Sequence, residues 1–527
     1  TQGVSSAASD VYKRQIADTL SSIWERLSVP IIAVGEFIPD GVPYLSTDNP
    51  VASNTYPRVD GSDGPLRAPV EMAAGISGNV RGALAVRSRD GESYVIAGTD
   101  NALWQMTATG WINRGSGYGV PEARSWQFAQ FGDQVIGVEG SQAPVAWTIG
   151  SSSPFAAMSG APTARYVATV EPGFLMLGAI DDGTGPRGNV VRWSGLNDAT
   201  VWPTPGTTAA LAVQSDEQEL ANGGAVTGIV PAIGGAAAAI FTEQAIYRVE
   251  YVGPSAIFSF READRTRGCV CPNGIASVNA AAYFIAEDGF FAFDGSTVSP
   301  IGAGKVDRFF WDSVDRSRLN KVFASVDIVR KIIVWAWPTM GSGSSDRWLM
   351  LNYATGRWRY GDDAGLAVSY LFPARTATYT LEELDGLPEF AAAGLDSAGA
   401  PSLDDVRFIG GQRVLAGFNA SGRLVSFTGA ALAARIETGE TDSSGKRVFV
   451  SGLRPLTDAN SATAGVASRE RFGDALVHGP QVGLNAEMRC PQRVSGRYVR
   501  ADVRIPAGAS WSYLQGVDVQ MRAEGKR

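Results

Sequence analysis

The fold of this chain is most constrained by a repeated unit in which two apolar segments are joined by a short polar turn. Residues 283–295 contain an apolar run, a turn centred on Asp288-Gly289 and an aromatic run. An Asp-Gly pair accommodates the positive φ angles of a tight two-residue turn, so this segment predicts a β-hairpin. Comparable units lie at residues 94–104, 239–249 and 414–427. A chain made of such units is expected to form antiparallel sheets.

Further hairpins are expected at residues 126–138, 166–178, 322–337 and 348–360, and a strand followed by a turn at 190–202. Five predicted turns lie near residues 132, 172, 244, 288 and 329, which are 40, 72, 44 and 41 residues apart. A repeat of roughly 40–45 residues, lengthened once, is typical of β-propeller blades. One blade cannot bury both of its faces alone, and closing the blades into a ring buries them. The sequence therefore predicts a mainly β fold that contains a β-propeller.

The propeller is predicted to span residues 78–429. Residues 305–319 are predicted to form a helical insertion, because four apolar side chains fall roughly on one helical face: Val306, Phe309, Phe310 and Val314. A second insertion, residues 370–405, is rich in polar loops. Alternating segments over residues 430–527 predict a separate β-sandwich-like platform domain at the C-terminal end.

Two segments precede the predicted propeller. Residues 30–77 are rich in Pro, Asp, Ser and Gly, which predicts an extended arm that lies across a neighbouring domain or subunit. Residues 1–29 are treated as a separate N-terminal segment with a short predicted helix over 16–27. Residues 1–15 resemble read-through sequence at the ends of assembled reading frames, and an ordinary flexible N-terminus is the equal alternative.

The charge balance argues against a protein that grips nucleic acid. The chain has 45 Lys and Arg against 53 Asp and Glu, which gives a formal net charge of −8, and no basic run stands out. Such a surface suits the transient, non-specific passage of DNA, since like charges repel. Three cysteines form no disulfide framework, which favours folding in a reducing cytoplasm. No apolar run approaches the roughly 20 residues of a membrane span, so no stable membrane insertion is expected.

Histidine and cysteine offer little catalytic or metal-binding chemistry. His478 is the one histidine of the chain, so any Ser-His-Asp triad would depend on it, and a structural or surface role is favoured. Cys269 and Cys271 form a Cys-x-Cys pair without a second pair to complete four zinc ligands, which favours a turn with a buried thiol. The sequence therefore predicts no catalytic, cofactor-binding or metal-binding residue.

Three other patterns are weighed in the same way. The small-residue run 233–239 lacks the Lys-Ser/Thr of a phosphate-binding loop, and a tightly packed inner strand near a propeller axis is expected instead. Paired carboxylates are expected to serve turn geometry: Asp181-Asp182, Glu287-Asp288 and Asp362-Asp363. The aromatic strings at 335–337 and 357–360 are expected to be core, with stacking on sugars as the alternative.

Several short strings follow one another in a fixed order along the chain. They lie at residues 164–168 (ARYVA), 191–198 (VRWSGLND), 214–216 (QSD), 246–253 (IYRVEYVG), 288–295 (DGFFAFDG), 300–302 (PIG) and 305–310 (KVDRFF). This ordered series resembles the nozzle or tail-hub (tail-stabilisation) proteins of short-tailed bacteriophages. The resemblance covers roughly residues 30–427 and leaves out the first residues and the C-terminal part.

The resemblance implies a structural virion protein of the tail, made in the host cytoplasm, and not an enzyme. It implies a ring of six copies below the portal and adaptor rings, which continues the DNA-ejection channel, closes it before infection and supports fibres or spikes. The family has no catalytic residue to carry over. The loops 181–187 and 382–388 are candidates for contacts with neighbours or for narrowing the channel. The alternatives are a receptor- or glycan-binding tail component and, less favoured, a propeller glycoside hydrolase.

Overall fold

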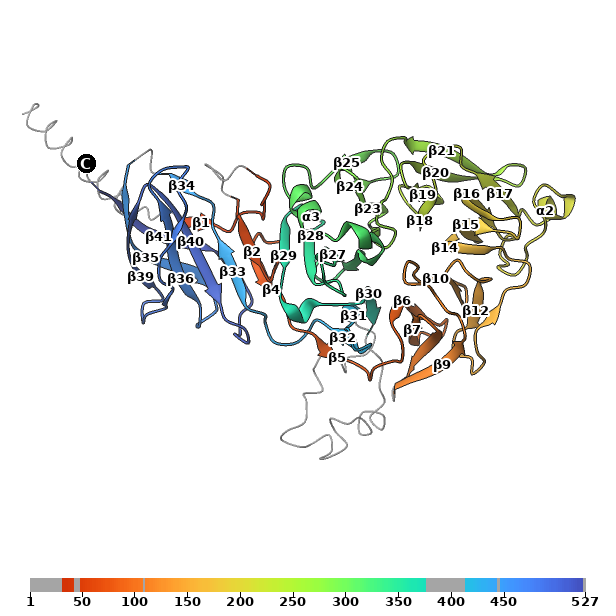
Figure 1. The fold of residues 1–527 in the computed structure, drawn as a ribbon, viewed down its shortest axis with the longest axis horizontal. Coiled ribbons are helices and arrows are strands. Elements are labelled where there is room, and N and C mark those ends of the chain that lie inside the picture. Colours follow the sequence, from red (N-terminus) through yellow and green to blue (C-terminus); the bar gives the residue numbers. More distant parts are fainter. Residues whose placement is uncertain (1–30, 42–47, 108–109, 376–412, 443–445, 525–527) are drawn as a thin grey trace, which may run out of the picture.

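The computed structural model describes residues 31–41, 48–107, 110–375, 413–442 and 446–524. Strands dominate these residues, and the helices among them are short. Figure 1 shows a ring of small sheets with a second β domain beside it. The chain is a β-propeller joined to a β-sandwich, so the predicted fold class is confirmed. The predicted helix at 16–27 and most of the loop-rich insertion at 370–405 lie outside the described residues.

The described residues form seven four-stranded antiparallel blades, six as separate sheets and one, blade 6, as part of an eleven-stranded sheet. Blade 1 contains β6 (Val80–Arg87), β7 (Ser93–Thr99), β8 (Ala102–Thr107) and β9 (Gly110–Ser116). Blade 2 contains β10 (Gln127–Phe131), β11 (Gln134–Val138), β12 (Val145–Thr148) and β13 (Ala156–Ala157). Blade 3 contains β14 (Thr163–Val170), β15 (Phe174–Asp181), β16 (Pro186–Trp193) and β17 (Asp216–Glu219), with the short helix α2 (Thr208–Ala212) inserted.

The remaining blades follow the same plan. Blade 4 contains β18 (Val226–Pro231), β19 (Ala238–Thr242), β20 (Ile246–Gly253) and β21 (Ile257–Asp264). Blade 5 contains β22 (Ala276–Val278), β23 (Ala281–Ala286), β24 (Gly289–Phe293) and β25 (Val298–Pro300). Blade 6 contains β26 (Phe323–Asp327), β27 (Ile332–Trp337), β28 (Arg347–Asn352) and β29 (Trp358–Gly361). Blade 7 contains β30 (Tyr370–Arg375), β31 (Arg413–Phe418), β32 (Leu424–Ser426) and β5 (Val70–Glu71).

The ring is closed by strands from its two ends. β5 lies before blade 1 in the sequence but pairs with β32, with Val425 opposite Glu71 and Ser426 opposite Val70. Seven apolar clusters of described residues lie between neighbouring blades, one for each pair, and the cluster between blades 7 and 1 packs Phe418 near Val95. Burial of one large apolar side chain contributes about 1.5–3 kcal/mol, so these interfaces hold the ring together.

The sandwich packs two sheets face to face. One sheet contains β1 (Ile31–Ala33), β3 (Thr55–Pro57), β4 (Asp63–Pro65), β35 (Val448–Thr457), β39 (Cys490–Gly496) and β41 (Leu514–Ala523). The other contains β2 (Val51–Ser53), β33 (Ala434–Glu437), β34 (Thr441–Asp442), β36 (Thr463–Arg469), β37 (Val477–His478), β38 (Val482–Gly483) and β40 (Tyr498–Ile505). Their facing side chains, such as Ile436, Val503 and Val519, share one buried cluster with blades 5 and 6.

The segment expected to be an extended arm, residues 30–77, instead contributes short strands to both domains. β1, β3 and β4 join one sheet of the sandwich, and β5 completes blade 7. β2 pairs in parallel with β29 through Ser53 and Tyr360, and antiparallel with β33. One continuous sheet therefore runs from blade 6 into the sandwich. The domain that was expected to begin at residue 430 is completed by strands from the other end of the chain.

A buried ion pair fastens this segment to blade 6. Arg359 Nε lies 2.6 Å from Asp63 Oδ2, and neither side chain is exposed. Arg359 also donates to the Gly35 carbonyl, and Arg357 donates to the Val34 carbonyl at 2.9 Å. The string 357–360, for which sugar stacking was the alternative, thus holds the N-terminal segment in place.

The predicted helical insertion is present as α3 (Asp307–Ser313), followed by the 3-10 turns η1 (Arg316–Lys321); a further 3-10 turn, η2 (Ala364–Leu366), follows blade 6. Val306, Phe310 and Val314 are buried, as the apolar face predicts. Asp40 accepts hydrogen bonds from the Arg308 and Phe309 N–H groups and so caps the helix. Among the described residues, no helix is long and apolar enough to span a membrane.

The hairpin at 283–295 forms, but its turn is shifted by one residue. Ala286 pairs with Gly289, so Glu287 and Asp288 make the turn and Gly289 begins β24. Gly289 has φ +139°, and a Cβ there would lie 2.3 Å from the Asp307 carboxylate. The glycine is therefore required by its φ and by its close approach to Asp307. The turns near 132, 172 and 329 join first and second strands, whereas those near 244 and 288 join second and third strands. This change and the α2 insertion explain the long gap of 72 residues.

Candidate binding site at the propeller axis

The inner ends of several blades meet at one end of the propeller axis. The first strand of each blade contacts the first strand of its neighbour for most pairs, so these strands surround the axis. The residues just before β6, β10, β22 and β26 therefore gather there. They include Asn79, Glu122, Asn273 and Asn320.

Hydrogen bonds connect blade 2 with blades 5 and 6 across this end of the axis. Asn273 Nδ2 donates to Ser125 Oγ at 3.0 Å and to the Asn320 carbonyl at 2.7 Å, and Gln127 Nε2 donates to Asn273 Oδ1 at 2.8 Å. Asn320 Nδ2 in turn donates to the Glu122 carbonyl at 3.1 Å. Direct protein contacts thus bridge the axis of the ring.

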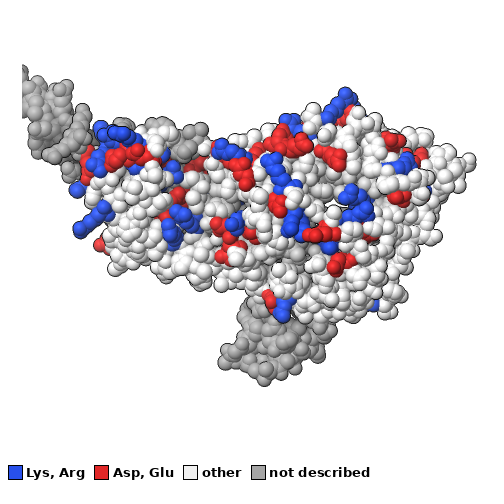
Figure 2. Space-filling model, viewed as in Figure 1, with Lys and Arg blue, Asp and Glu red and all other residues white. Residues whose placement is uncertain are grey.

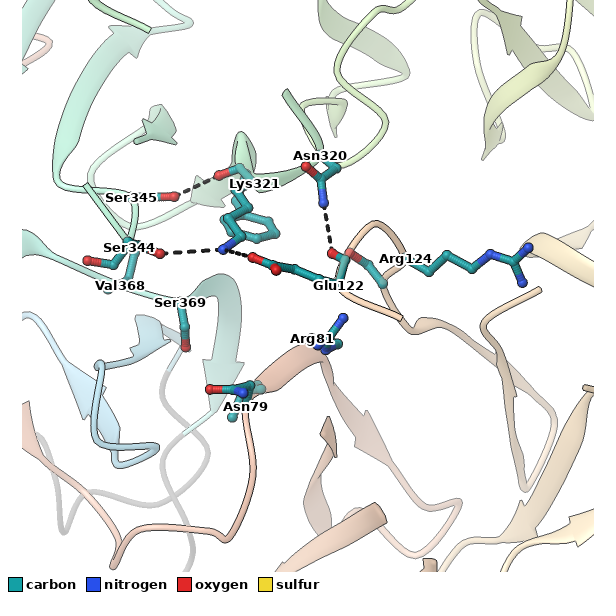
Figure 3. Close-up of a pocket in the computed structure, with 14 residues that line it drawn as sticks. Asn79, Arg81, Glu122, Arg124, Asn320, Lys321, Ser344, Ser345, Val368 and Ser369 are labelled. Carbon is teal, nitrogen blue, oxygen red and sulfur yellow. Dashed lines mark hydrogen bonds and ion pairs between the residues drawn. The ribbon is translucent and has the colours of Figure 1, made fainter. Parts of the chain in front are cut away.

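A cavity of about 240 Å³ lies beside these bridges, between blades 1, 2, 6 and 7. Its lining combines amides, hydroxyls and three cationic side chains with apolar surface (Figure 3). The residues that line it are Asn79, Val80, Arg81, Glu122, Arg124, Ser125, Asn320, Lys321, Phe323, Gly343, Ser344, Ser345, Val368 and Ser369. We call this cavity the axial pocket.

Among the described residues, Glu122 is the one carboxylate that lines the axial pocket, and Lys321 pairs with it. Lys321 Nζ lies 2.8 Å from Glu122 Oε1. This hydrogen bond, with the positive charges of Lys321, Arg318 and Arg81, holds the pKa of Glu122 below its ordinary value. Glu122 is therefore a carboxylate at neutral pH, and its charge offsets that of Lys321.

Arg81 is the cation of the axial pocket that has two guanidinium nitrogens without an acceptor among the described residues. Its Nε and Nη1 atoms are buried, and no described residue accepts a hydrogen bond from them. In Figure 3 its side chain lies near Glu122, while Arg124 extends away from Glu122. Arg124 Nη1 donates to Ser141 Oγ at 2.8 Å. A buried N–H without an acceptor costs about 1–3 kcal/mol, so the described residues leave part of the Arg81 guanidinium unsatisfied.

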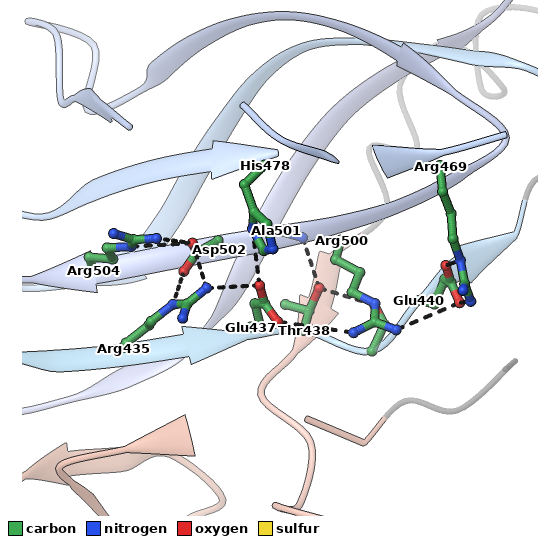
Figure 4. A network of polar contacts seen from close by, with 11 residues as sticks. Arg435, Glu437, Thr438, Glu440, Arg469, His478, Arg500, Ala501, Asp502 and Arg504 are labelled. Carbon is green, nitrogen blue, oxygen red and sulfur yellow. Dashed lines mark hydrogen bonds and ion pairs between the residues drawn. The ribbon is translucent and has the colours of Figure 1, made fainter. Parts of the chain in front are cut away.

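His478 lies in a separate polar network on the sandwich (Figure 4). Its side chain is partly exposed, and Nδ1 lies 3.4 Å from Glu437 Oε1. Glu437, His478 and Asp502 place three possible metal-ligating atoms within 4.8 Å of one another. Arg435 already contacts both carboxylates, with distances of 3.0 Å to Glu437 Oε1 and 3.0 Å to Asp502 Oδ1. The donor set is thus neutralised by arginine, which does not fit a divalent cation.

Arginines stabilise the charged form of Asp502 in this network. Burial by itself disfavours the carboxylate, but hydrogen bonds from Arg504 and Arg435 hold the pKa of Asp502 below its ordinary value. Further along the same face, Arg469 binds Glu440 through Nε at 2.7 Å. These contacts form an ion-pair network that ties β33 to β40 and β36.

Cys269 and Cys271 are both fully buried. Cys269 Sγ lies 3.1 Å from the Cys271 carbonyl oxygen. Burial raises the pKa of Cys269 to about 12 and that of Cys271 well above its ordinary value. Since thiolates are the metal-binding and nucleophilic form, these thiols are suited to packing in the core.

The small-residue run 233–239 was expected to be an inner strand near the axis, but most of it makes the turn between β18 and β19, and its last two residues begin β19. A Cβ on Gly234 would lie 2.2 Å from the Asp294 carbonyl oxygen of blade 5. Small residues occur here because the turns of two blades approach each other closely, not because bulk is excluded from the axis.

The paired carboxylates lie in turns. Asp181 accepts from the Gly183 N–H at 2.9 Å, and Asp363 accepts from the Gly365 N–H at 2.8 Å. Asp288 pairs with Arg267 at 3.2 Å beside a cavity of about 270 Å³ that Glu243 and Glu287 also line. The loop 181–187 carries an Arg187–Glu217 ion pair, and the loop 382–388 lies outside the described residues.

The aromatic strings are core. Trp335, Trp337 and Trp358 have no exposed surface, and Phe290 packs edge-on against Trp335 and Trp358. No Trp or Tyr among the described residues is exposed to solvent to a large extent. Phe472, in the sandwich, has 44% of its surface exposed.

Sequence reasoning missed the axial pocket. Arg81, Arg124 and Lys321 are far apart in the chain and belong to no short motif. The available signal was their position, because each lies at or just before the first strand of a blade. With the phase of the repeat known, residues at that position are expected to meet at the axis.

No family model matches this chain, and no curated protein matches it. Among solved structures, the chain is similar to the computationally designed Ika8 protein, with 12% identity, a TM-score of 0.34 and coverage of 69% of this chain and 99% of that chain. It is similar to YCF48 bound to D1 peptide, with 9% identity, a TM-score of 0.37 and coverage of 68% and 94%. It is also similar to a chain of the Mitotic Checkpoint Complex, with 10% identity, a TM-score of 0.36 and coverage of 69% and 95%. With TM-scores below 0.5, these likenesses carry no functional conclusion, and the propeller is assigned from its own sheets and clusters.

Proposed function

We propose that this chain is a structural subunit of a bacteriophage tail, of the nozzle or tail-hub type. In this proposal about six copies form a ring below the portal and adaptor rings and carry fibres or spikes. The ordered strings that resemble this family support it. Those at 164–168, 246–253 and 288–295 lie on blades 3, 4 and 5, and 305–310 leads into α3.

The observation that carries the proposal is the way in which the two domains are joined. One sheet continues from blade 6 through β2 into the sandwich, one apolar cluster spans the junction, and the Asp63–Arg359 pair is buried there. Two domains joined in this way form one rigid body, which suits a structural subunit, whereas an enzyme that closes on its substrate needs a hinge.

The path of DNA in the proposed assembly lies between subunits. Hydrogen bonds from Asn273 and Asn320 bridge the axis of the propeller, so the axis of one chain is not a route for a double helix. Figure 2 shows side chains of both charge signs intermingled over the face in view, without a large basic area. With a formal net charge of −8, such a wall is suited to let DNA slide past.

Assembly tests this proposal. Purified full-length chain should form rings on its own or on addition of the portal–adaptor complex of the phage that encodes it, measured by native mass spectrometry and sedimentation velocity. A chain that stays monomeric and does not bind that complex at any concentration tested would contradict the proposal. The same complex from a distantly related phage is a suitable control for specificity.

The hydrolase alternative has one feature that can be tested directly. Glu243, Glu287 and Asp288 line the cavity beside Arg267, and glycoside hydrolysis needs two facing carboxylates. The assay is the release of reducing ends from host capsule. If Glu287→Gln abolishes this release and a substitution of the distant Glu92 does not, a hydrolase is favoured over the structural role.

A further inference from the structure

The axial pocket combines a defined volume with an unbalanced charge. Arg81, Arg124 and Lys321 line it against the one carboxylate of Glu122, and Lys321 already pairs with Glu122 at 2.8 Å. Arg124 is directed toward Ser141. Arg81 makes no ion pair with Glu122 and acts on that carboxylate only through space, so two cations, Arg81 and Lys321, share one carboxylate.

The described residues also leave guanidinium N–H groups of Arg81 without a hydrogen-bond acceptor. Two of its guanidinium nitrogens, Nε and Nη1, are buried without an acceptor among the described residues. Guanidinium groups bind carboxylate and phosphate through paired, charge-assisted hydrogen bonds. Nothing in the lining other than Glu122 offers an anionic group to Arg81.

The rest of the lining suits a small oxyanion. Ser344, Ser369 and Asn79 add hydroxyl and amide groups that can donate hydrogen bonds to oxygen. The volume of about 240 Å³ is below the range of pockets that hold drug-sized ligands. It has room for one charged group and a short substituent.

We propose that the axial pocket binds a small molecule that carries one phosphate or carboxylate group, with Arg81 as its principal ligand. Lys321 contributes a second positive charge, which it shares with Glu122. The inference rests on the pocket alone and is independent of the proposed tail function. A phosphomonoester and a sugar acid present the same oxyanion chemistry to Arg81, so the experiment separates these two sources.

Calorimetric titration of the full-length chain at low ionic strength tests the proposal. The probes are inorganic phosphate, glucuronate and, as a neutral control, glucose. We expect one saturable site per chain for at least one of the two anions and no binding of glucose. Saturation by phosphate alone assigns a phosphate ligand, and saturation by glucuronate alone assigns a carboxylate ligand.

Two substitutions in the pocket should act in opposite directions. Arg81→Gln removes the charge and should weaken anion binding about tenfold or more. Glu122→Gln removes the competing carboxylate and frees Lys321, so it should strengthen binding severalfold. Arg89→Gln is the matched control, because Arg89 is an exposed arginine that pairs with Asp133 outside the pocket; its affinity should equal that of the unmodified chain.

The proposal is wrong if neither anion binds saturably to the unmodified chain. It is also wrong if Arg81→Gln and Arg89→Gln bind the anion equally well. The gain expected for Glu122→Gln keeps the test decisive where Arg81→Gln fails to fold, since unchanged or weaker binding by Glu122→Gln contradicts the assigned charge balance.

Discussion

The propeller and the sandwich are built from the same kind of strand but are held together differently. In the propeller, nearly all strands pair with their neighbours in sequence, as β23 and β24 do across the turn at Glu287 and Asp288, and β5 with β32 is the exception. In the sandwich, strands from opposite ends of the chain pair, as Ile31 does with Asp518. One chain thus combines a domain whose strands pair mostly with their sequence neighbours and a domain whose sheets need strands from both ends of the chain.

The two regions also differ in what they bury. The interfaces between blades are apolar and aromatic, as at Ile96 and Trp126. The sandwich and its junction with blade 6 bury charge, with the Asp63–Arg359 pair at the junction and Asp502 among arginines. Removing one member of a buried pair costs more than removing an exposed charge, so substitutions should affect the two regions differently.

The largest effect is expected at the junction. Asp63→Asn leaves Arg359 buried without a counter-charge and should lower the free energy of unfolding by about 3–5 kcal/mol. Urea denaturation of the full-length chain measures this change. Because Asp63 lies on β4 and Arg359 on β29, we expect both domains to be affected.

Asp133→Asn is the control for this prediction. Asp133 pairs with Arg89 on the surface of the propeller, and exposed pairs contribute about 0–1 kcal/mol. Equal losses for Asp63→Asn and Asp133→Asn would contradict a special role for the junction.

A smaller effect is expected between blades 4 and 5. Gly234 has φ +55° and would place a Cβ 2.2 Å from the Asp294 carbonyl oxygen, whereas Gly235 has φ +75° and open space around it. Both alanine substitutions incur about 1–2 kcal/mol for the left-handed backbone. Gly234→Ala should lose about 1–3 kcal/mol more, because it also overpacks the contact between blades. Equal thermal stability of the two variants would show that the turns do not approach closely.

The smallest effects concern pH, and they have opposite signs in the two regions. Burial, together with the nearby Asp40 and Asp288 carboxylates, raises the pKa of Asp307 to about 6 against the hydrogen bond from Phe290 N–H. A raised pKa in the folded state stabilises the protein below the ordinary pKa, near 4, and this stabilisation is lost as pH rises through about 6. Relative to the unmodified chain, Asp307→Asn should therefore raise the free energy of unfolding more at pH 7 than at pH 4.

Asp502→Asn should do the reverse. Arg504 and Arg435 lower the pKa of Asp502 despite its burial, so its stabilisation is present above the ordinary pKa and is lost as pH falls through the lowered one. The substitution should thus destabilise most at neutral pH. Urea denaturation of both variants between pH 3 and pH 7 gives the two trends, and trends of the same sign would contradict the comparison.

Sequence patterns predicted the propeller better than the sandwich, for a physical reason. Hairpins such as 283–295 carry their partners within a few residues, so an apolar–turn–apolar pattern suffices. β5, which closes blade 7, has two residues, and its partner β32 lies at the other end of the propeller. β2 and β4 have three residues each, and nothing near them in sequence indicates β29, β33 or β41 as their partners.

The axial pocket escaped prediction for the same reason. Arg81 and Lys321 come from blades 1 and 6, and their proximity depends on the number of blades and on the phase of the repeat. The prediction of no catalytic or metal-binding residue depended only on residue types, namely one histidine, three cysteines and few charges, and it stays a prediction. The string 357–360 was ambiguous between core and sugar stacking until Arg359 was placed against Asp63.

Electron cryo-microscopy of the full-length chain bound to its portal–adaptor complex is the decisive test of the proposed tail ring. We expect a closed ring of chains in which the DNA path lies between subunits and each propeller axis stays bridged by Asn273 and Asn320. Chains that bind singly without forming a ring, or DNA that runs through the axis of one propeller, would contradict it.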